Sequence, residues 1–196
     1  MNKSVNIAMK KRHILESLKS LLEKYSYSYV SMQDVANEAG ISKGGLRYYF
    51  PTKESLFVGL LEDFFTGIES SHLQMINSQE TDSDRVVLST LFNIESFVLD
   101  HKNIKIFLNL MLYGLEEPKV MKPISAFFRK HLEIYKKIIE QAKSDLPVID
   151  RNEFDTAFHA RITQIIFMSA GLLEAADPTG MEPSKLARYV ISLFSK

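Results

Sequence analysis

The sequence contains no cysteine among its 196 residues, so disulfide bonds, thiolate-ligated metals and cysteine redox sensing are all excluded. It also has no run of about 18 apolar residues, the length that a membrane-spanning helix needs. The N-terminal stretch is polar and lysine-bearing, and it lacks the apolar segment of a signal peptide. We therefore expect a cytoplasmic protein without a membrane-spanning helix.

Catalytic motifs are scarce as well. No histidine has another one three or four residues away, the spacing that puts two metal ligands on one helix face; the five are His13, His72, His101, His131 and His159. A glycine-rich phosphate loop and a nucleophile elbow are also missing. We predict that the protein is not an enzyme and binds no metal or other cofactor, although an active site assembled from distant residues would leave no such pattern.

The formal net charge is zero, but the charge is unevenly divided along the chain. Residues 1–54 contain nine Lys or Arg against five Asp or Glu, whereas residues 55–196 contain fifteen against nineteen. A positive N-terminal part suits attraction to phosphate groups. The excess is modest, so it supports nucleic-acid binding without proving it.

A hydrophobic content of 45% is enough for a buried core, in one domain or in two small ones. Apolar residues recur at helical spacing, and no convincing strand occurs. Gly59 and Gly67 fall inside a long predicted helix, where we expect close packing rather than a bend. Pro118 and Pro123 are expected to fragment the chain. The predicted helices cover residues 6–24, 32–39, 42–49, 52–77, 83–100, 103–115, 123–144, 150–176 and 183–195.

The most informative segment is residues 31–53, SMQDVANEAGISKGGLRYYFPTK. Ser31 is placed to cap a first short helix, with Asp34 completing a capping box. Gly40 supplies the positive φ that ends this helix, and Ser42 is placed to cap a second one. Two such helices that cross at a fixed angle let one of them enter the major groove of DNA. A plain helical hairpin, with Gly40 as a simple C-cap, is the alternative.

This segment resembles the DNA-binding segment of the tetracycline-repressor (TetR) family, which typically reads S-M-x-D-I-A-x-x-A-G-V-S-K-G-T-L-Y-Y-Y-F-x-x-K-x-x-L. The resemblance covers roughly residues 10–60, and beyond them only length and helical character agree. It implies an all-α protein of about nine helices. An N-terminal three-helix helix-turn-helix domain would span residues 1–54, and a C-terminal helical domain for ligand binding and dimerisation would span residues 55–196.

Three positions depart from the family pattern. Ser26 stands where the family often has glycine, so a left-handed cap there would be strained. Gly45 stands where threonine is frequent, which removes a hydroxyl group that could contact DNA. Arg47 stands where tyrosine is frequent, which adds a donor fork suited to guanine O6 and N7. The operator therefore need not resemble that of other family members.

The resemblance assigns the groove-entering helix to residues 42–49. We expect Arg47 to read a base edge, with Lys43 as the second candidate. One of the two adjacent tyrosines is expected to pack inward with Phe50, leaving Tyr49 to face the DNA. Hydroxyl, amide and ammonium groups at the helix starts are expected to contact phosphates. The predicted DNA-binding set is Ser31, Gln33, Ser42, Lys43, Gly44, Gly45, Arg47, Tyr48, Tyr49 and Lys53.

One short helix meets too few bases to select a site, so we expect a two-fold homodimer on a palindromic operator, with recognition helices about 34–36 Å apart. The resemblance places the interface on the predicted helices 150–176 and 183–195. Apolar residues on both sides of these helices argue for burial on both sides. The predicted interface residues are Phe154, Ile162, Ile165, Ile166, Leu172, Leu173, Leu186, Val190, Leu193 and Phe194.

The resemblance further implies a small-molecule effector that binds among the C-terminal helices and shifts the helix at residues 52–77. Such a ligand must favour one conformation, because equal affinity for both shifts nothing. Composition suggests an apolar effector, aromatic or acyl, and plain core packing is the alternative role for each aromatic candidate. The candidate ligand-binding residues are Phe64, Phe92, Glu95, Phe107, Tyr113, Phe127, Phe128, Phe158, Arg161 and Phe167.

Glu95 and Arg161 each border an apolar stripe, where an unpaired charge would be costly to bury. Three roles are open: the two pair with each other, reach solvent at a helix margin, or hold a polar end of the ligand. Three functions are open as well. A ligand-responsive repressor bound to double-stranded DNA is favoured over a DNA-binding protein without small-molecule control, and over a helical ligand-binding protein or enzyme that does not bind DNA.

Overall fold

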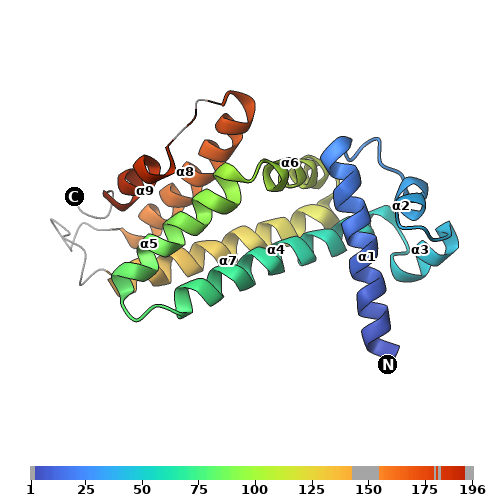
Figure 1. Ribbon diagram of the computed structural model, residues 1–196, viewed down its shortest axis with the longest axis horizontal. Helices are drawn as coiled ribbons and strands as arrows, with labels where there is room; N and C mark the ends of the chain where they lie inside the picture. The colour runs from blue at the N-terminus through green and yellow to red at the C-terminus, as the bar shows by residue number, and fades with distance from the viewer. Residues whose placement is uncertain (1–2, 143–154, 179, 181, 193–196) are drawn as a thin grey trace. The chain divides into compact units, whose positions relative to one another are not determined.

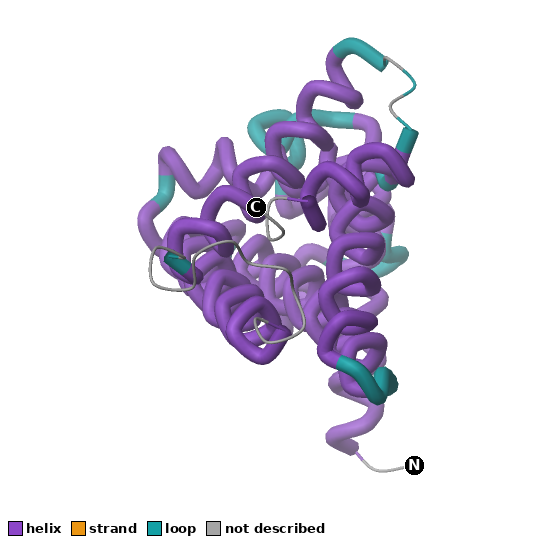
Figure 2. The backbone as a smooth tube through the Cα atoms, turned by 90° about the vertical axis from the view of Figure 1, so that its left-hand side faces the viewer, coloured by secondary structure: helices purple, strands orange, loops and turns teal. Residues whose placement is uncertain are grey.

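The computed structural model describes residues 3–142, 155–178, 180 and 182–192, and these residues form helices and loops only (Figure 2). The all-α prediction is confirmed. Along the chain (Figure 1), the described residues form α1 Lys3–Lys24, α2 Met32–Glu38, α3 Lys43–Tyr49, α4 Lys53–Asn77, α5 Asp82–Asn93, a π-helix Ile94–Leu99, α6 His101–Glu116, α7 Pro118–Ala142, α8 Thr156–Ala176 and α9 Pro183–Ser192.

Proline did not break the chain where we expected it to. Helix α7 begins at Pro118 and runs through Pro123, so the prediction of a fragmented segment was wrong. Pro118 occupies the first helical position, where a missing N–H costs nothing. Pro123 lies one turn further, and the carbonyl that loses its partner belongs to the exposed Lys119, within reach of solvent.

Two other boundaries also differ from the prediction. The expected helix over residues 83–100 is α5 followed by the π-helix Ile94–Leu99. Helix α8 is capped by Asp155, whose Oδ1 accepts a hydrogen bond from the Phe158 N–H at 3.0 Å. The predicted start of this helix at residue 150 and the last residues of the predicted helix 183–195 lie outside the described residues.

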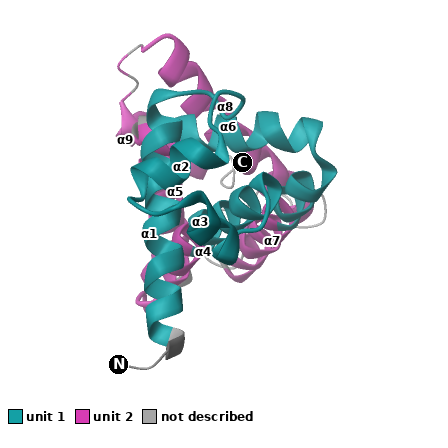
Figure 3. Ribbon diagram, turned by 90° about the vertical axis from the view of Figure 1, so that its right-hand side faces the viewer, with its two compact units in different colours: residues 1–66, 105–126 teal, residues 67–104, 127–196 magenta. Residues whose placement is uncertain are grey.

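The chain divides into two compact units (Figure 3): Met1–Thr66 with Lys105–Ala126, and Gly67–Ile104 with Phe127–Lys196. This division differs from the expected functional boundary between residues 54 and 55, because the start of α4 and most of α6 pack with the N-terminal helices. The functional boundary itself stays a prediction.

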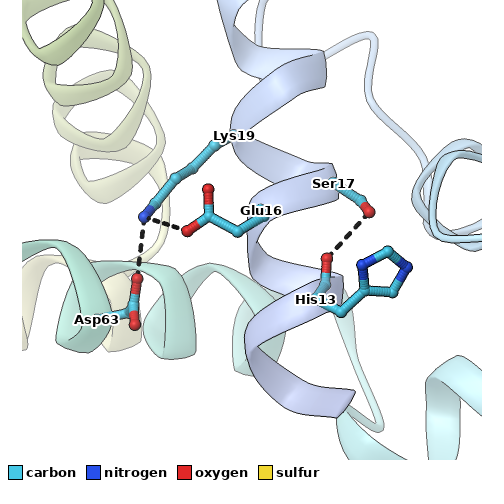
Figure 4. Close-up of polar contacts among 5 residues, drawn as sticks. All are labelled: His13, Glu16, Ser17, Lys19 and Asp63. Carbon is cyan, nitrogen blue, oxygen red and sulfur yellow. Dashed lines mark hydrogen bonds and ion pairs between the residues drawn. The ribbon is translucent and has the colours of Figure 1, made fainter. Parts of the chain in front are cut away.

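The first unit is held together by the buried faces of α1 and α4. Leu18 and Leu22 of α1 and Leu60 of α4 are fully buried, and α2 contacts both α1 and α3. Figure 4 shows the Lys19 ammonium between two carboxylates, 2.9 Å from Glu16 Oε1 and 3.0 Å from Asp63 Oδ2. Burial lowers the pKa of Lys19, but hydrogen bonds to the two carboxylates outweigh it and raise the pKa above its ordinary value.

Gly59 of α4 and Phe50 at the end of α3 approach each other closely. A Cβ atom at position 59 would lie 2.7 Å from Phe50 Cε1, so the expected role of Gly59 in close packing is confirmed. The same expectation was wrong for Gly67, where nothing lies within 4 Å of a Cβ atom. Phe50 is buried and also lies under the Lys11 ammonium, 5.6 Å from the ring centroid.

The second unit is built from the end of α4, α5, the π-helix, the first residues of α6, α7 from Phe127 onward, α8 and α9. Helix α5 contacts α9, and the π-helix contacts α8. No helix among the described residues is both long and apolar enough to cross a membrane. The buried core of this unit consists of Ile76, Val86, Ile94, Tyr135, Ile138, Ile139, Ala160, Phe167, Ala170, Ala187 and Val190.

Candidate functional site

The turn between α2 and α3 is fixed by backbone chemistry. Gly40 has φ 63°, its N–H donates to Asn37 O at 3.1 Å, and the Ile41 N–H donates to Ala36 O at 2.9 Å. These two bonds form a Schellman motif, which satisfies carbonyls at the helix end and requires a left-handed residue. At the other end of α2, Ser31 and Asp34 form the predicted capping box. The expected positive φ of Gly40 is confirmed.

Helix α3 presents its cations outward. Ser42 caps it by accepting a hydrogen bond from the Gly45 N–H at 3.0 Å, and Leu46 is fully buried. Lys43 and Arg47 are exposed, and neither forms a hydrogen bond or ion pair with any residue that the structure describes. Both side chains are therefore free to contact a partner, and Gly44 between them leaves the backbone open.

The two tyrosines of α3 are placed differently from the expectation. Tyr48 is 72% exposed, whereas Tyr49 is half-buried, and the rings meet edge to face at 5.0 Å. Phe50 is the aromatic side chain that packs inward. Tyr48 is therefore the more accessible of the pair, and the DNA-facing role of Tyr49 stays a prediction.

Lys53 turns inward instead of outward. Its ammonium donates to Tyr27 O at 2.7 Å and lies 5.7 Å from the centroids of both the Phe57 and Tyr113 rings. Burial lowers the pKa of Lys53 below its ordinary value. To contact phosphate, Lys53 would have to leave this aromatic site, which makes it the weakest member of the predicted DNA-binding set. Ser31, Gln33 and Ser42 are exposed, as a phosphate-contacting group must be.

The loop between α1 and α2 avoids the expected strain at Ser26. Among the described residues only Gly40 and Gly180 have positive φ, so Ser26 adopts no left-handed conformation. Instead the Tyr27 N–H donates to Asn109 Oδ1 of α6 at 2.7 Å, and the Tyr27 ring stacks on Tyr113 at 5.1 Å. Contacts with α6 hold this loop in place of a glycine cap.

A surface groove of about 620 Å³ runs beside α2 in the first unit. Its lining includes the exposed Tyr25 and Tyr29 and the carboxylates of Asp34 and Glu38, which accept hydrogen bonds from Ser31 and Ser20. None of the predicted ligand-binding residues lies in it.

The predicted ligand-binding aromatics do not form one cluster. Phe64, Phe107 and Tyr113 belong to the first unit, and all three are buried there. Tyr113 meets the Phe57 ring edge to face at 4.8 Å and donates a hydrogen bond to Glu54 Oε1 at 3.3 Å. Burial and the adjacent Glu54 carboxylate raise the pKa of the Tyr113 phenol to about 12.

Three of the predicted aromatics come together in the second unit. Phe127, Phe128 and Phe167 line a small cavity, which we call the phenylalanine hollow. A second cavity, the isoleucine hollow, lies beside it and shares Tyr135. The phenylalanine hollow is lined by Asn93, Phe127, Phe128, His131, Tyr135, Gln164, Phe167 and Met168; the isoleucine hollow is lined by Val86, Ser89, Thr90, Tyr135, Ile138, Ile139 and Thr163.

The buried histidines of this unit were not predicted as site residues. His72 of α4 and His131 of α7 are 59 positions apart, yet their rings stack with centroids 5.8 Å apart. His72 also stacks on the predicted Phe92 at 4.9 Å, and its Nε2 hydrogen-bonds to Ser89 Oγ at 2.8 Å. One signal was available: each histidine takes an apolar position at four-residue spacing, His72 between Ile68 and Ile76 and His131 between Phe127 and Tyr135.

Burial controls the protonation of this pair. Burial lowers the pKa of His72 to about 4, and burial, His72 and Lys130 together lower the pKa of His131 to about 3. Both imidazoles are therefore neutral near pH 7. No third metal ligand accompanies them among the described residues.

Glu95 and Arg161 are both exposed, and no ion pair joins them within the described part of the chain. The Arg161 guanidinium donates instead to Gln164 Oε1 at 2.7 Å. Phe158, another predicted ligand residue, is 59% exposed on α8. These three side chains line neither hollow, and their ligand-binding role stays a prediction.

Several predicted interface residues form an exposed stripe on α8. Ile165, Leu172 and Leu173 are exposed, and Ile162 is half-buried. Ile166 and Leu186 pack against the core of their own unit, and Val190 is fully buried in it. Phe154, Leu193 and Phe194 lie outside the described residues.

Comparison with known proteins places the N-terminal segment. Residues 14–60 match the family model of the bacterial regulatory proteins of the tetR family. The chain is 30% identical over 74 residues to the HTH-type transcriptional regulator EthR of Mycolicibacterium smegmatis, which covers 38% of this chain and 34% of that protein. The chain spans about a third of the length of the first curated relatives it matches.

Two solved structures share the fold over nearly the whole chain. A transcriptional regulator from Saccharomonospora viridis in complex with choline superimposes with a TM-score of 0.81 at 16% identity, covering 95% of each chain. The regulator FadR from Bacillus subtilis in complex with stearoyl-CoA gives 0.78 at 15% identity, covering 94% of this chain and 97% of that one. The helix-turn-helix geometry and these matches lead to one conclusion: residues 14–60 carry the N-terminal segment of the tetR family of bacterial regulatory proteins, and the chain shares the fold of bacterial transcriptional regulators.

Proposed function

We propose that this protein is a ligand-responsive, DNA-binding transcriptional regulator of the cytoplasm and not an enzyme. It acts as a repressor that leaves its operator when a small apolar effector binds. The observation that carries the proposal is helix α3, which is capped by Ser42, anchored by the buried Leu46, and exposes Lys43 and Arg47 without partners among the described residues. Such a helix is built to enter a groove.

The proposed division of labour on DNA follows from what each group can do. Arg47 reads a guanine edge, since its guanidinium can donate to O6 and N7 together. Ser31, Gln33 and Ser42 contact phosphates, which orient the protein without reading sequence. Tyr48 joins this set because it is more accessible than Tyr49.

A homodimer supplies a second recognition helix. The exposed apolar stripe of α8, which includes Phe158, Ile165 and Leu172, offers a surface whose burial favours association. A two-fold dimer of this kind binds a palindromic operator, with half-sites about 34–36 Å apart.

Support for an effector comes from both the chain and its structural neighbours. The phenylalanine and isoleucine hollows of the second unit have aromatic and aliphatic walls, and two proteins of the same fold carry choline or stearoyl-CoA. Helix α4 contains residues of both units. A shift of its second half when an effector binds can therefore change the position of the recognition helix.

Footprinting of the purified chain on the DNA upstream of its own coding region tests the function. We expect a two-fold symmetric footprint and an affinity that falls steeply as salt rises. Arg47→Ala should weaken it strongly, whereas Arg188→Ala removes the same charge at an exposed position of α9 and should leave it intact. A protein that stays monomeric and binds no fragment at low salt would contradict the proposal.

A further inference from the structure

Unpartnered imidazole nitrogens lie in the interior of the second unit. His72 and His131 are 0% and 2% exposed, and His72 Nδ1 and His131 Nε2 have no hydrogen-bond partner within the described residues. Native proteins leave few buried polar atoms unpaired. Such an atom in a cavity wall marks a place where a ligand can supply the missing partner.

His131 is the histidine that reaches a cavity wall. It lines the phenylalanine hollow, and its ring is fixed between Phe127, with centroids 4.3 Å apart, and Tyr135, with centroids 5.8 Å apart. Gln164 and Asn93 in the same wall are already engaged, since the Gln164 amide donates to Phe128 O at 3.1 Å and Asn93 Oδ1 accepts from the Tyr135 hydroxyl. The open hydrogen-bonding position in the wall is therefore His131 Nε2.

No charged residue among those that the structure describes lies in the wall of either hollow. Lys130, next to His131, points to an ion pair with Glu69 of α4, and Arg161 is bound to Gln164. A charged ligand entering this space would lose its hydration without gaining a counter-charge, which is strongly unfavourable. The walls suit an uncharged molecule.

The space available shows which side chain must move. The phenylalanine and isoleucine hollows hold about 10 Å³ and 20 Å³, room for about one water molecule each. Tyr135 lines both, and its hydroxyl is bonded to Asn93. Displacing Tyr135 would join the two hollows into one space. A ligand that requires this movement binds one conformation better than the other, as an effector must.

We propose that the effector is an uncharged molecule with an apolar body and one hydrogen-bonding group, which pairs with His131 Nε2 in a space opened by movement of Tyr135. The proposal deepens the proposed function and rests on it for the regulatory role of this ligand. It sets this chain apart from the neighbours that carry a cation or an acyl-CoA.

Calorimetric titration of the full chain without DNA tests the ligand class with two matched probe sets. One set is 2-naphthamide, 2-naphthoate and 2-naphthyltrimethylammonium; the other is octanamide, octanoate and octyltrimethylammonium. In at least one set the amide should bind about tenfold or more tightly than both ions. The free-energy cost of burying one unpaired charge is larger than the energy that corresponds to this tenfold difference. An amide preference below about tenfold in both sets, or no binding of either amide, overturns the proposal.

Variants then locate the contact. His131→Phe keeps an aromatic ring, removes the nitrogens and should weaken amide binding about tenfold. His131→Gln should restore part of it. The same change at His159 of α8, which lines neither hollow, should alter nothing. Equal effects of His131→Phe and His159→Phe would refute the assignment. A thermal melt of each variant separates lost contact from lost fold.

Tyr135→Phe should change the affinity for the amide in the opposite direction from His131→Phe. Removing the hydroxyl breaks the bond to Asn93 that holds the cavity closed, so amide affinity should rise about two- to tenfold. Weaker binding would overturn the opening step. DNA release is measured separately: an amide that binds but never releases DNA refutes the proposed function alone, whereas release by ions only refutes this inference alone.

Discussion

The α2–α3 segment of the first unit and the interior of the second unit satisfy their polar groups over very different lengths of chain. In the first unit, Ser31 pairs with Asp34 and Ser42 with Gly45, each three residues away. In the second, the Tyr135 hydroxyl reaches Asn93, 42 residues away, and His72 reaches Ser89, 17 residues away. The α2–α3 segment therefore presents a surface that local sequence dictates, whereas the second unit contains an interior that only the tertiary fold assembles.

The largest expected effect concerns the surface of the first unit. Arg47→Ala should weaken operator binding by about 1–3 kcal/mol per half-site, hence about 2–6 kcal/mol for a symmetric dimer. Stability should not change, because the exposed Arg47 side chain has no partner in the described part of the chain. Fluorescence anisotropy with operator DNA and thermal melts measure the two quantities. A variant that melts early would show that this side chain also supports the fold.

Acidification should act on the interior of the second unit. Below pH 6.5 the unfolded chain binds protons on His72 and His131, whereas the folded chain, with pKa values of about 4 and about 3, does not. The free energy of unfolding should therefore fall by up to about 1.4 kcal/mol per pH unit for each histidine, or about 3 kcal/mol for the pair between pH 6.5 and 5.

Urea unfolding at several pH values measures this dependence. His72→Gln and His131→Gln should each remove about half of the histidine contribution, while His13→Gln, in the first unit, should leave it in place. A pH dependence that is the same in all three variants would argue against a buried neutral pair.

Packing between α3 and α4 gives an intermediate effect. Gly59→Ala places a methyl group 2.7 Å from Phe50 Cε1, and the ring must shift. We expect a loss of about 1–3 kcal/mol in the free energy of unfolding, typical of overpacking. The change also disturbs the end of the recognition helix, so operator affinity should fall with it.

Gly67→Ala is the matched control in the same helix. Position 67 is exposed with nothing within 4 Å, so alanine should raise the free energy of unfolding by about 0.5–1 kcal/mol, because glycine disfavours a helix interior. If both substitutions destabilise alike, close packing is not what distinguishes Gly59.

The smallest effect is expected for the ion pair in Figure 4. Lys19 joins α1 to α4 through Asp63, but the side chains keep 21% and 33% of their exposure. Lys19→Met should cost less than about 1 kcal/mol, as measured for most exposed pairs. A double-mutant cycle with Asp63→Asn measures the coupling, and a value well above this limit would mean that solvent screens the pair less than its exposure implies.

Local chemistry explains which features the sequence could predict. Caps at Ser31 and Ser42 and the left-handed Gly40 depend on neighbours within a few residues, and all three were predicted correctly. Pro123 was misjudged because a general rule for proline ignores how close the residue lies to a helix start. The inward turn of Lys53 depends on Tyr113 of a distant helix, which no local pattern reveals.

The interior of the second unit shows the same limit. His72 and His131 each carried a visible signal, an apolar position occupied by a polar ring. Their stacking depends on how α4 and α7 pack, and periodicity does not specify which helices become neighbours. Phe127, Phe128 and Phe167 were predicted as candidates, but their grouping apart from Phe64, Phe107 and Tyr113 required the fold.

The contact between Gly59 and Phe50 determines how the N-terminal DNA-binding segment could be transferred to another regulator. A chimaeric regulator joined at residue 54 would set Phe50 against whatever side chain the recipient carries at the position of Gly59, and any side chain there collides with the ring. The smallest exchangeable cassette thus extends past Gly59, and recipients with a larger residue at that junction should yield hybrids that bind DNA poorly even when every base-contacting residue has been transferred.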